Sequence, residues 1–179
     1  MEGHRYYYYA LDETPLAGRK ATAQIRVRRT SEGARTDIIY QGKRIGTAQF
    51  VRVGKAKLRG RPVLRSNGIF INPKYMGKGL MQKAMIATFR HFNKTWFVAD
   101  TNVSRKGQKL YRNLARSPHV ATTRAARFRS CHKTATWRWK KPTEEGYWPM
   151  DWHGWYPVGY ARYQTRIHPA CKLAFRWEG

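Results

Sequence analysis

Residues 67–85 constrain the fold of this chain more than any other segment. They read Asn-Gly-Ile-Phe-Ile-Asn-Pro-Lys-Tyr-Met-Gly-Lys-Gly-Leu-Met-Gln-Lys-Ala-Met. The apolar run 69–71 is typical of a β-strand, Pro73 stops it, and the apolar spacing of residues 79–91 predicts a helix. Glycines let the backbone approach a ligand, and a helix N-terminus points free N–H groups at it. A strand, a glycine turn and a helix in this order therefore favour a bound phosphate or diphosphate.

The turn alone leaves a second interpretation open, because a tight strand-to-helix connection that binds nothing looks the same. Its surroundings favour a ligand. A second strand is predicted over 95–99, and a second helix over 105–116, capped by Ser104 and ended before Pro118. Matching residues lie at the strand exit, in the turn and in the second helix: Ile71, Asn72, Pro73, Tyr75, Gly77, Lys78, Gly79, Leu80, Leu110, Tyr111 and Leu114. Over residues 36–115 this order resembles the acetyl-CoA-binding half of the GNAT acyltransferase superfamily.

The resemblance implies an α/β fold of GNAT-like architecture, with a mixed, twisted central sheet flanked by helices. It also implies acetyl-CoA or another acyl-CoA as cofactor, with its diphosphate at the turn. The expected cofactor-binding residues are Phe70, Ile71, Met76, Gly77, Lys78, Gly79 and Leu80. Met76 stands where the family prefers Arg or Gln, and Met81 where it prefers a small residue.

Three residues are candidates for the chemistry of acyl transfer. By the resemblance, Tyr111 protonates the departing thiolate, and Ser104 stands where the family usually has Asn. Asp100 follows the second predicted strand, near the place where the family's two central strands separate to admit the thioester, and is the candidate base or orienting group. An ion pair with an arginine is an equally open role for this carboxylate.

The charge of the chain predicts its partner. The 36 Lys and Arg against 10 Asp and Glu give a formal net charge of +26, and between Asp37 and Glu144 the only acidic residue is Asp100. Such an excess favours a polyanion, with nucleic acid, DNA before RNA, ahead of an anionic membrane surface. The residues expected to contact it come from a basic loop over 54–62, a stripe on the second helix and the aromatic stretch beyond it: Lys55, Lys57, Arg59, Arg61, Arg105, Lys109, Arg112, Arg116, Arg127, Arg129, Trp137 and Trp139.

A single domain over 1–179 is expected, since 179 residues are enough for one sizeable core. Residues 119–179 are expected to form an aromatic, basic C-terminal extension. Its aromatic residues interleave with arginines and would either stack on bases or pack in the core, and the alternation over 134–139 is also typical of a half-buried strand. Strands are further predicted over 6–11 and 23–29, and a hairpin over 36–53 around Gln41-Gly42-Lys43.

The combined prediction is acyl-CoA-dependent acyl transfer to an amine of a nucleic acid or of a nucleic-acid-bound substrate, similar to the Mom-type bacteriophage enzymes that modify adenine in DNA. The alternatives are a non-catalytic nucleic-acid-binding protein and a structural component of a virion or ribonucleoprotein. No apolar run approaches the roughly 20 residues that cross a bilayer, so no membrane partner and a cytoplasmic location are expected, the host cytoplasm if the chain is phage-encoded. Cys131 and Cys171 lack a paired metal-ligand spacing, so no metal site is predicted.

Overall fold

The computed structural model describes residues 7–9, 22–100, 103–125, 134–140, 156–162 and 168–179. Within these residues the strands are β1 (Tyr7–Tyr9), β2 (Gln24–Arg29), β3 (Gly33–Tyr40), β4 (Lys43–Leu58), β5 (Arg61–Ile71), β6 (Trp96–Val98), β7 (Val120–Arg124), β8 (Thr134–Lys140), β9 (Tyr156–Arg162) and β10 (Leu173–Trp177). The helices are α1 (Leu80–His91) and α2 (Arg105–Ala115), with short 3₁₀ segments η1 (Pro73–Tyr75) and η4 (Pro169–Lys172).

Eight of the described strands form one mixed sheet in the order β1-β2-β3-β4-β5-β6-β10-β7, and β8 pairs with β9 in a second, two-stranded sheet. Only the β5–β6 pair of the described strands is parallel. The predicted mixed α/β architecture is therefore confirmed at this level. Neither described helix is long and apolar enough to span a membrane.

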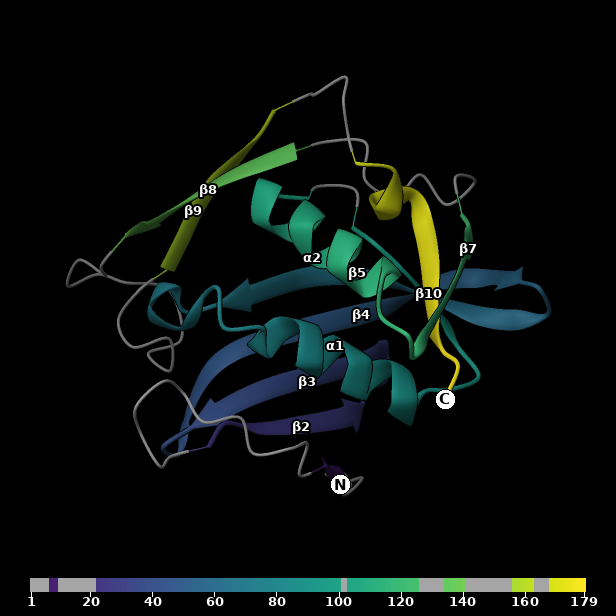
Figure 1. Cartoon of the computed structure of the whole chain (residues 1–179), viewed down its shortest axis with the longest axis horizontal. Coiled ribbons are helices and arrows are strands. Elements are labelled where there is room, and N and C mark those ends of the chain that lie inside the picture. The colour runs from purple at the N-terminus through teal and green to yellow at the C-terminus, as the bar shows by residue number, and fades with distance from the viewer. Residues whose placement is uncertain (1–6, 10–21, 101–102, 126–133, 141–155, 163–167) are drawn as a thin grey trace.

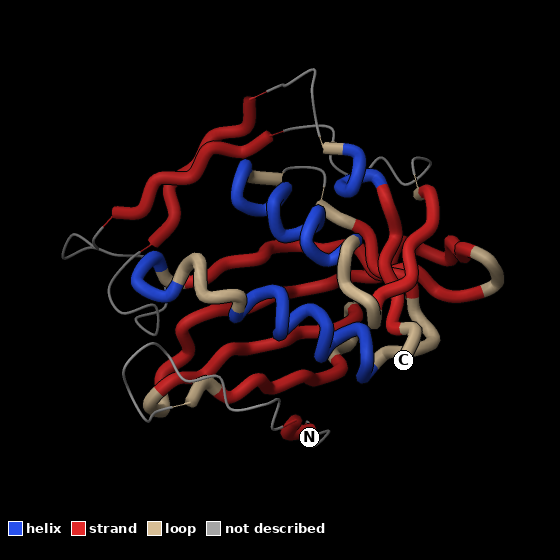
Figure 2. The backbone as a smooth tube through the Cα atoms, in the orientation of Figure 1, coloured by secondary structure: helices blue, strands red, loops and turns tan. Residues whose placement is uncertain are grey.

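Both described helices pack on the same face of the eight-stranded sheet (Figures 1 and 2). The ring of Phe175 in β10 lies 6.3 Å from that of Phe89 in α1 and 5.6 Å from that of Tyr111 in α2, measured between centroids. The sequence predicted helices on the faces of the sheet, whereas both described helices lie on one face. Because apolar spacing shows only that a helix has a buried side, it cannot assign that helix to one face of a sheet.

The alternation of apolar and basic residues in β2 explains which of its side chains face the core. Ile25 and Val27 are buried in the core beneath α1, while Arg26 and Arg28 point to the other face. The turn at Gln41 and Gly42 has positive φ at both residues, 49° and 73°, which suits a two-residue hairpin. The predicted hairpin between β3 and β4 is confirmed.

The predicted basic loop over 54–62 is wrong, because these residues continue the sheet. β4 extends to Leu58, β5 begins at Arg61, and the hairpin protrudes beyond β10 and β7 at the right of Figure 1. The register shifts between Arg52 and Lys57, so β4 bulges there. Leu58 is 9% exposed and packs in a small apolar cluster with Val63 and Trp96, a tertiary contact that a charge-rich local sequence does not reveal.

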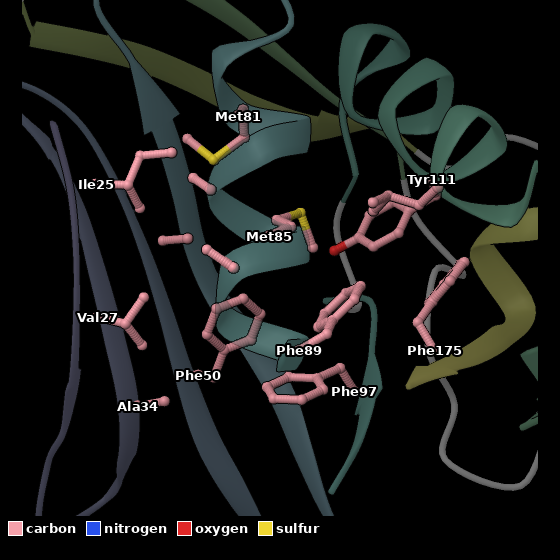
Figure 3. Packing of buried hydrophobic residues seen from close by; sticks show 14 of the residues in the cluster. Ile25, Val27, Ala34, Phe50, Met81, Met85, Phe89, Phe97, Tyr111 and Phe175 are labelled. Carbon is pink, nitrogen blue, oxygen red and sulfur yellow. The ribbon is translucent and has the colours of Figure 1, made fainter. Parts of the chain in front are cut away.

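The C-terminal segment is not only an extension, since β10 lies inside the sheet between β6 and β7. Phe175 is fully buried and joins Phe50, Phe89 and Phe97 in the core shown in Figure 3. The alternation over 134–139 does form a strand, β8, at the upper left of Figure 1. The side chains of β8 and β9 lie outside the described residues, so the choice between stacking and packing for Trp137 and Trp139 stays open.

A buried pair of hydroxyls joins the sheet to α1. Thr36 and Thr88 are fully buried, their Oγ1 atoms lie 2.6 Å apart, and Thr88 also donates to the carbonyl of Ala84 at 2.8 Å. Because a hydroxyl has one proton, the Thr36 hydroxyl must donate to Thr88.

The direction of this hydrogen bond predicts that two isosteric substitutions lower the stability by different amounts. Thr88→Val leaves a buried donor at Thr36 without an acceptor and should lower the free energy of unfolding by about 1–3 kcal/mol. Thr36→Val removes only one hydrogen bond and should cost roughly 0.5–1 kcal/mol. Urea unfolding of both variants measures the difference, and equal or reversed costs would contradict the assigned proton.

Candidate functional site

The carboxyl ends of the two parallel strands form one edge of the candidate site. β5 pairs with β6 only through Val63–Arg65, opposite Trp96–Val98, after which β6 ends and β5 continues to Ile71 paired with β4. The register of β5 with β4 shifts near Gly68, whose φ of 111° is accessible mainly to glycine. Crevices at the carboxyl ends of strands are common ligand sites in α/β proteins.

The glycine turn follows this separation directly. Asn72 is fully buried, and its side chain accepts a hydrogen bond from the backbone N–H of Lys74 at 3.0 Å, which sets the start of η1. Gly77 and Gly79 have φ of 77° and 72°, and a Cβ placed on either would meet no atom within 4 Å. Both positions thus need glycine for their conformation, and the protein leaves open space beside them.

The N-terminus of α1 has the features of an anion site. Its N-cap residue is Gly79, with no side-chain cap and no acidic residue in the first turn, whereas α2 is capped by Ser104. Lys78 is exposed, and Nζ of Lys106 lies 3.3 Å from Sδ of Met76, so the first turn of α2 is beside the glycine turn. Uncapped N–H groups and nearby ammonium groups favour a phosphate.

Met81, in the first turn of α1, does not occupy this space. It is 8% exposed and belongs to the core, and Figure 3 shows its side chain directed from α1 toward the strands. The glycine turn therefore keeps its open side although Met81 has a long side chain. Of the other cofactor candidates, Phe70 and Ile71 at the end of β5 are partly buried, and Leu80 is buried in the core.

The side chain of Tyr111, in α2, faces α1. It is 3% exposed, its ring packs on Phe175, and Figure 3 shows its hydroxyl directed toward Met85 of α1. The hydroxyl thus points to the same helix that carries the glycine turn, but from within the core. A substrate that it protonates must enter between α1 and α2.

The other two catalytic candidates differ in their surroundings. Oγ of Ser104 accepts a hydrogen bond from the backbone N–H of Gly107 at 3.0 Å, so its observed role is to cap α2. Asp100 follows β6 and is partly buried, at the edge where β5 and β6 separate. Asp100 is thus the one candidate carboxylate, and it lies just beyond the last β5–β6 pair.

Comparison with protein-family models, curated proteins and solved structures gives no match.

The nucleic-acid candidates fall into three groups. In the β4–β5 hairpin, Lys55, Lys57 and Arg59 are exposed, while Arg61 is partly buried and donates to the carbonyl of Asn93 at 3.2 Å. Lys109 of α2 and Arg116 at its C-cap are exposed, but Arg112 is partly buried with its Nε inaccessible, which breaks the predicted stripe. The remaining candidates cannot be placed. Arg127 and Arg129 lie outside the described residues, and for Arg105, Trp137 and Trp139 only the backbone is described.

The histidine at the end of α1 adds no charge to these groups. Burial, and then the charge of Arg29, lower the pKa of His91 from its ordinary value of 6.5. His91 is therefore neutral near pH 7, and the cations of this region are lysines and arginines.

Sequence analysis did not single out the arginines on the face of the sheet opposite the helices. Arg26 and Arg28 alternate with Ile25 and Val27, and this pattern is visible in the sequence. It predicts an arginine-bearing strand face, but it does not tell which other strands add arginines to the same face.

The exposed hairpin cations should contribute to polyanion binding. Replacing Lys55 and Arg59 by Gln should flatten the log–log dependence of DNA affinity on salt by about 0.9 unit for each lost phosphate contact. The measurement is an anisotropy titration with a labelled duplex at several salt concentrations. An unchanged slope would mean that the hairpin is merely solvated.

Proposed function

We propose that this protein is an acyl-CoA-dependent acyltransferase whose acceptor is an amine of a nucleic acid or of a substrate bound to one. One observation carries the proposal. Two parallel strands separate at their carboxyl ends, and the longer one leads into an open glycine turn at the uncapped N-terminus of α1. The same succession of elements is the basis of the resemblance to GNAT acyltransferases.

The residues at the turn fit the diphosphate of coenzyme A. The first-turn N–H groups of α1 would donate to phosphate oxygens, and Lys78 and Lys106 would add positive charge. The space beside Gly77 and Gly79 admits a ligand close to the backbone. When bound there, an acyl-CoA would supply the acyl group as a thioester.

The chain would contribute proton transfer and orientation. Tyr111, directed toward α1, would donate a proton to the departing thiolate. Asp100, at the end of β6, would accept a proton from the attacking amine or orient it. Backbone N–H groups near Ile71 would polarise the thioester carbonyl.

The charge of the chain supports a nucleic acid as the acceptor or its carrier. A net charge of +26 attracts polyanions and lets the protein associate rapidly with them.

A calorimetric titration with acetyl-CoA, followed by transfer of a radiolabelled acetyl group to DNA, tests the proposal. Saturable binding in the micromolar to millimolar range and label in the DNA fraction are expected. An absence of heat at millimolar acetyl-CoA would rule out the acyltransferase function.

A second function is a nucleic-acid-binding protein that performs no catalysis. The burial of Tyr111, 3% exposed against Phe175, favours it, because a general acid must reach its substrate. DNA binding without acetyl-CoA binding in the same experiments would select this function.

A further inference from the structure

The sheet face opposite the helices carries a set of arginines from strands that are far apart in the sequence. The register puts Arg26 opposite Asp37, Arg28 opposite Arg35, and Arg65 opposite Val51. On this face lie arginines of β2, β3, β4, β5 and β10, here called the arginine face: Arg26, Arg28, Arg35, Arg44, Arg65 and Arg176. All of them are partly exposed, although Nε is inaccessible in all but Arg35, so any contact with a ligand would be made by the Nη atoms.

The strands place like charges side by side on the arginine face. Arg28 and Arg35 are direct cross-strand neighbours. Like charges in this position repel each other, and the ion pair of Arg35 with Asp37 offsets only part of this repulsion. A bound anion between or above them would turn this repulsion into attraction.

Carboxylates on this face are too few to balance the arginines. Among the described strand residues of the arginine face, Asp37 is the only acid, and Nε of Arg35 at 3.0 Å and Nη1 of Arg44 at 3.9 Å share it. Its Oδ1 also accepts a hydrogen bond from Thr47 at 2.9 Å. The whole chain has 10 acids for 36 Lys and Arg, so pairing elsewhere cannot remove the excess.

Packing and the shared carboxylate of Asp37 restrict two of these side chains. The side chains of Arg35 and Arg44 are only 19% exposed, so most of each side chain is packed in the protein. Side chains that are already ordered lose less entropy when they bind. A guanidinium also presents parallel N–H donors that fit two phosphate oxygens, which an ammonium does not.

We propose that the arginine face binds the backbone phosphates of a nucleic acid. The face extends to the candidate site, because Arg65 is the last residue of β5 that pairs with β6 before the strands separate. A nucleic acid on this face would lie near the end of β6, which Asp100 follows. This link to acyl transfer rests on the proposed function, whereas phosphate binding by the arginine face does not.

The test compares two double variants of the full chain with equal loss of charge. Arg28→Gln with Arg65→Gln changes the arginine face, and Lys109→Gln with Arg116→Gln changes exposed cations of α2 on the helix side. Affinity for a fluorescent DNA duplex is measured by anisotropy at several salt concentrations without acyl-CoA. The first variant should flatten the log–log slope by about two units, roughly 0.9 for each contact, and the second should not. Equal slopes for the two variants, or flattening by the α2 variant alone, would overturn the proposal.

Two further measurements separate binding from folding and from catalysis. Arg28→Lys with Arg65→Lys keeps the charge and the salt slope but should weaken affinity, because bidentate contacts are lost. In the absence of DNA, Arg28→Gln should not lower the melting temperature; a large decrease together with normal DNA affinity would indicate a purely structural role. Binding to phosphatidylserine vesicles without binding to DNA would also reject the proposal. If acetyl-CoA fails to bind while the arginine-face slope holds, the proposed acyl transfer is wrong and the arginine face remains.

Discussion

Replacing Tyr111 by Phe should lower kcat for acyl transfer by about two to four orders of magnitude, with little change in the Kd of acetyl-CoA. A general acid acts on the thiolate only as it leaves, so the loss falls on the transition state and not on cofactor binding. The substitution removes only the hydroxyl directed toward Met85 and keeps the ring that packs on Phe175 at 5.6 Å. The fold should therefore remain intact.

A matched control is Tyr40→Phe. Tyr40 is 4% exposed and packs against Tyr75 at 5.5 Å, so it also loses a hydroxyl within a packed core. The kcat of the Tyr40→Phe variant should equal that of the wild-type protein. The pH profile gives an independent readout, since loss of the acid should remove the decline in kcat at high pH. Equal rates for Tyr111→Phe and the wild-type protein would exclude Tyr111 from the mechanism.

Replacing Gly79 by Val should abolish stabilisation of the protein by acetyl-CoA. The wild-type protein should gain about 2.7 kcal/mol at a ligand concentration of 100 times Kd. A valine side chain at Gly79 would enter the open space beside the turn, and its φ of 72° strains a β-branched residue. Thermal melting with and without acetyl-CoA measures the gain.

Strain alone also lowers stability, so the Gly79 variant needs a control with the same backbone cost. Gly42 in the β3–β4 turn has φ of 73° and equally open surroundings, but no ligand is expected there. Gly42→Val should melt earlier than the wild-type protein and still be stabilised by acetyl-CoA. If both variants keep the full ligand effect, the diphosphate is not bound at the glycine turn.

Elements that depend on near neighbours were predictable from the sequence. Ser104 was expected to cap α2 and does so by accepting from Gly107, and Gly79 directly precedes α1. The Gln41-Gly42 turn between β3 and β4 also follows from two residues. These signals act over a few residues, because caps and turns satisfy backbone groups that are close in the chain.

The residues of the glycine turn were likewise found from the sequence, but their surroundings were not. The burial of Met81 and Tyr111 depends on the packing of α1 and α2 against the same sheet face. Helical spacing identifies the buried side of each helix, yet it cannot tell which distant residues will cover it. The exposure of the Tyr111 side chain could therefore not be predicted from the sequence.

By itself, the sequence determined a mixed α/β chain with a strand, a glycine turn and a helix, and a net charge of +26 that favours polyanions. The tertiary structure decided that β10 lies between β6 and β7, that the 54–62 segment is a hairpin, and that both described helices share one face. It also decided that arginines from five strands share the opposite face. The physical reason is the same throughout: strand pairing joins residues that are remote in sequence, and local propensity does not specify the partner.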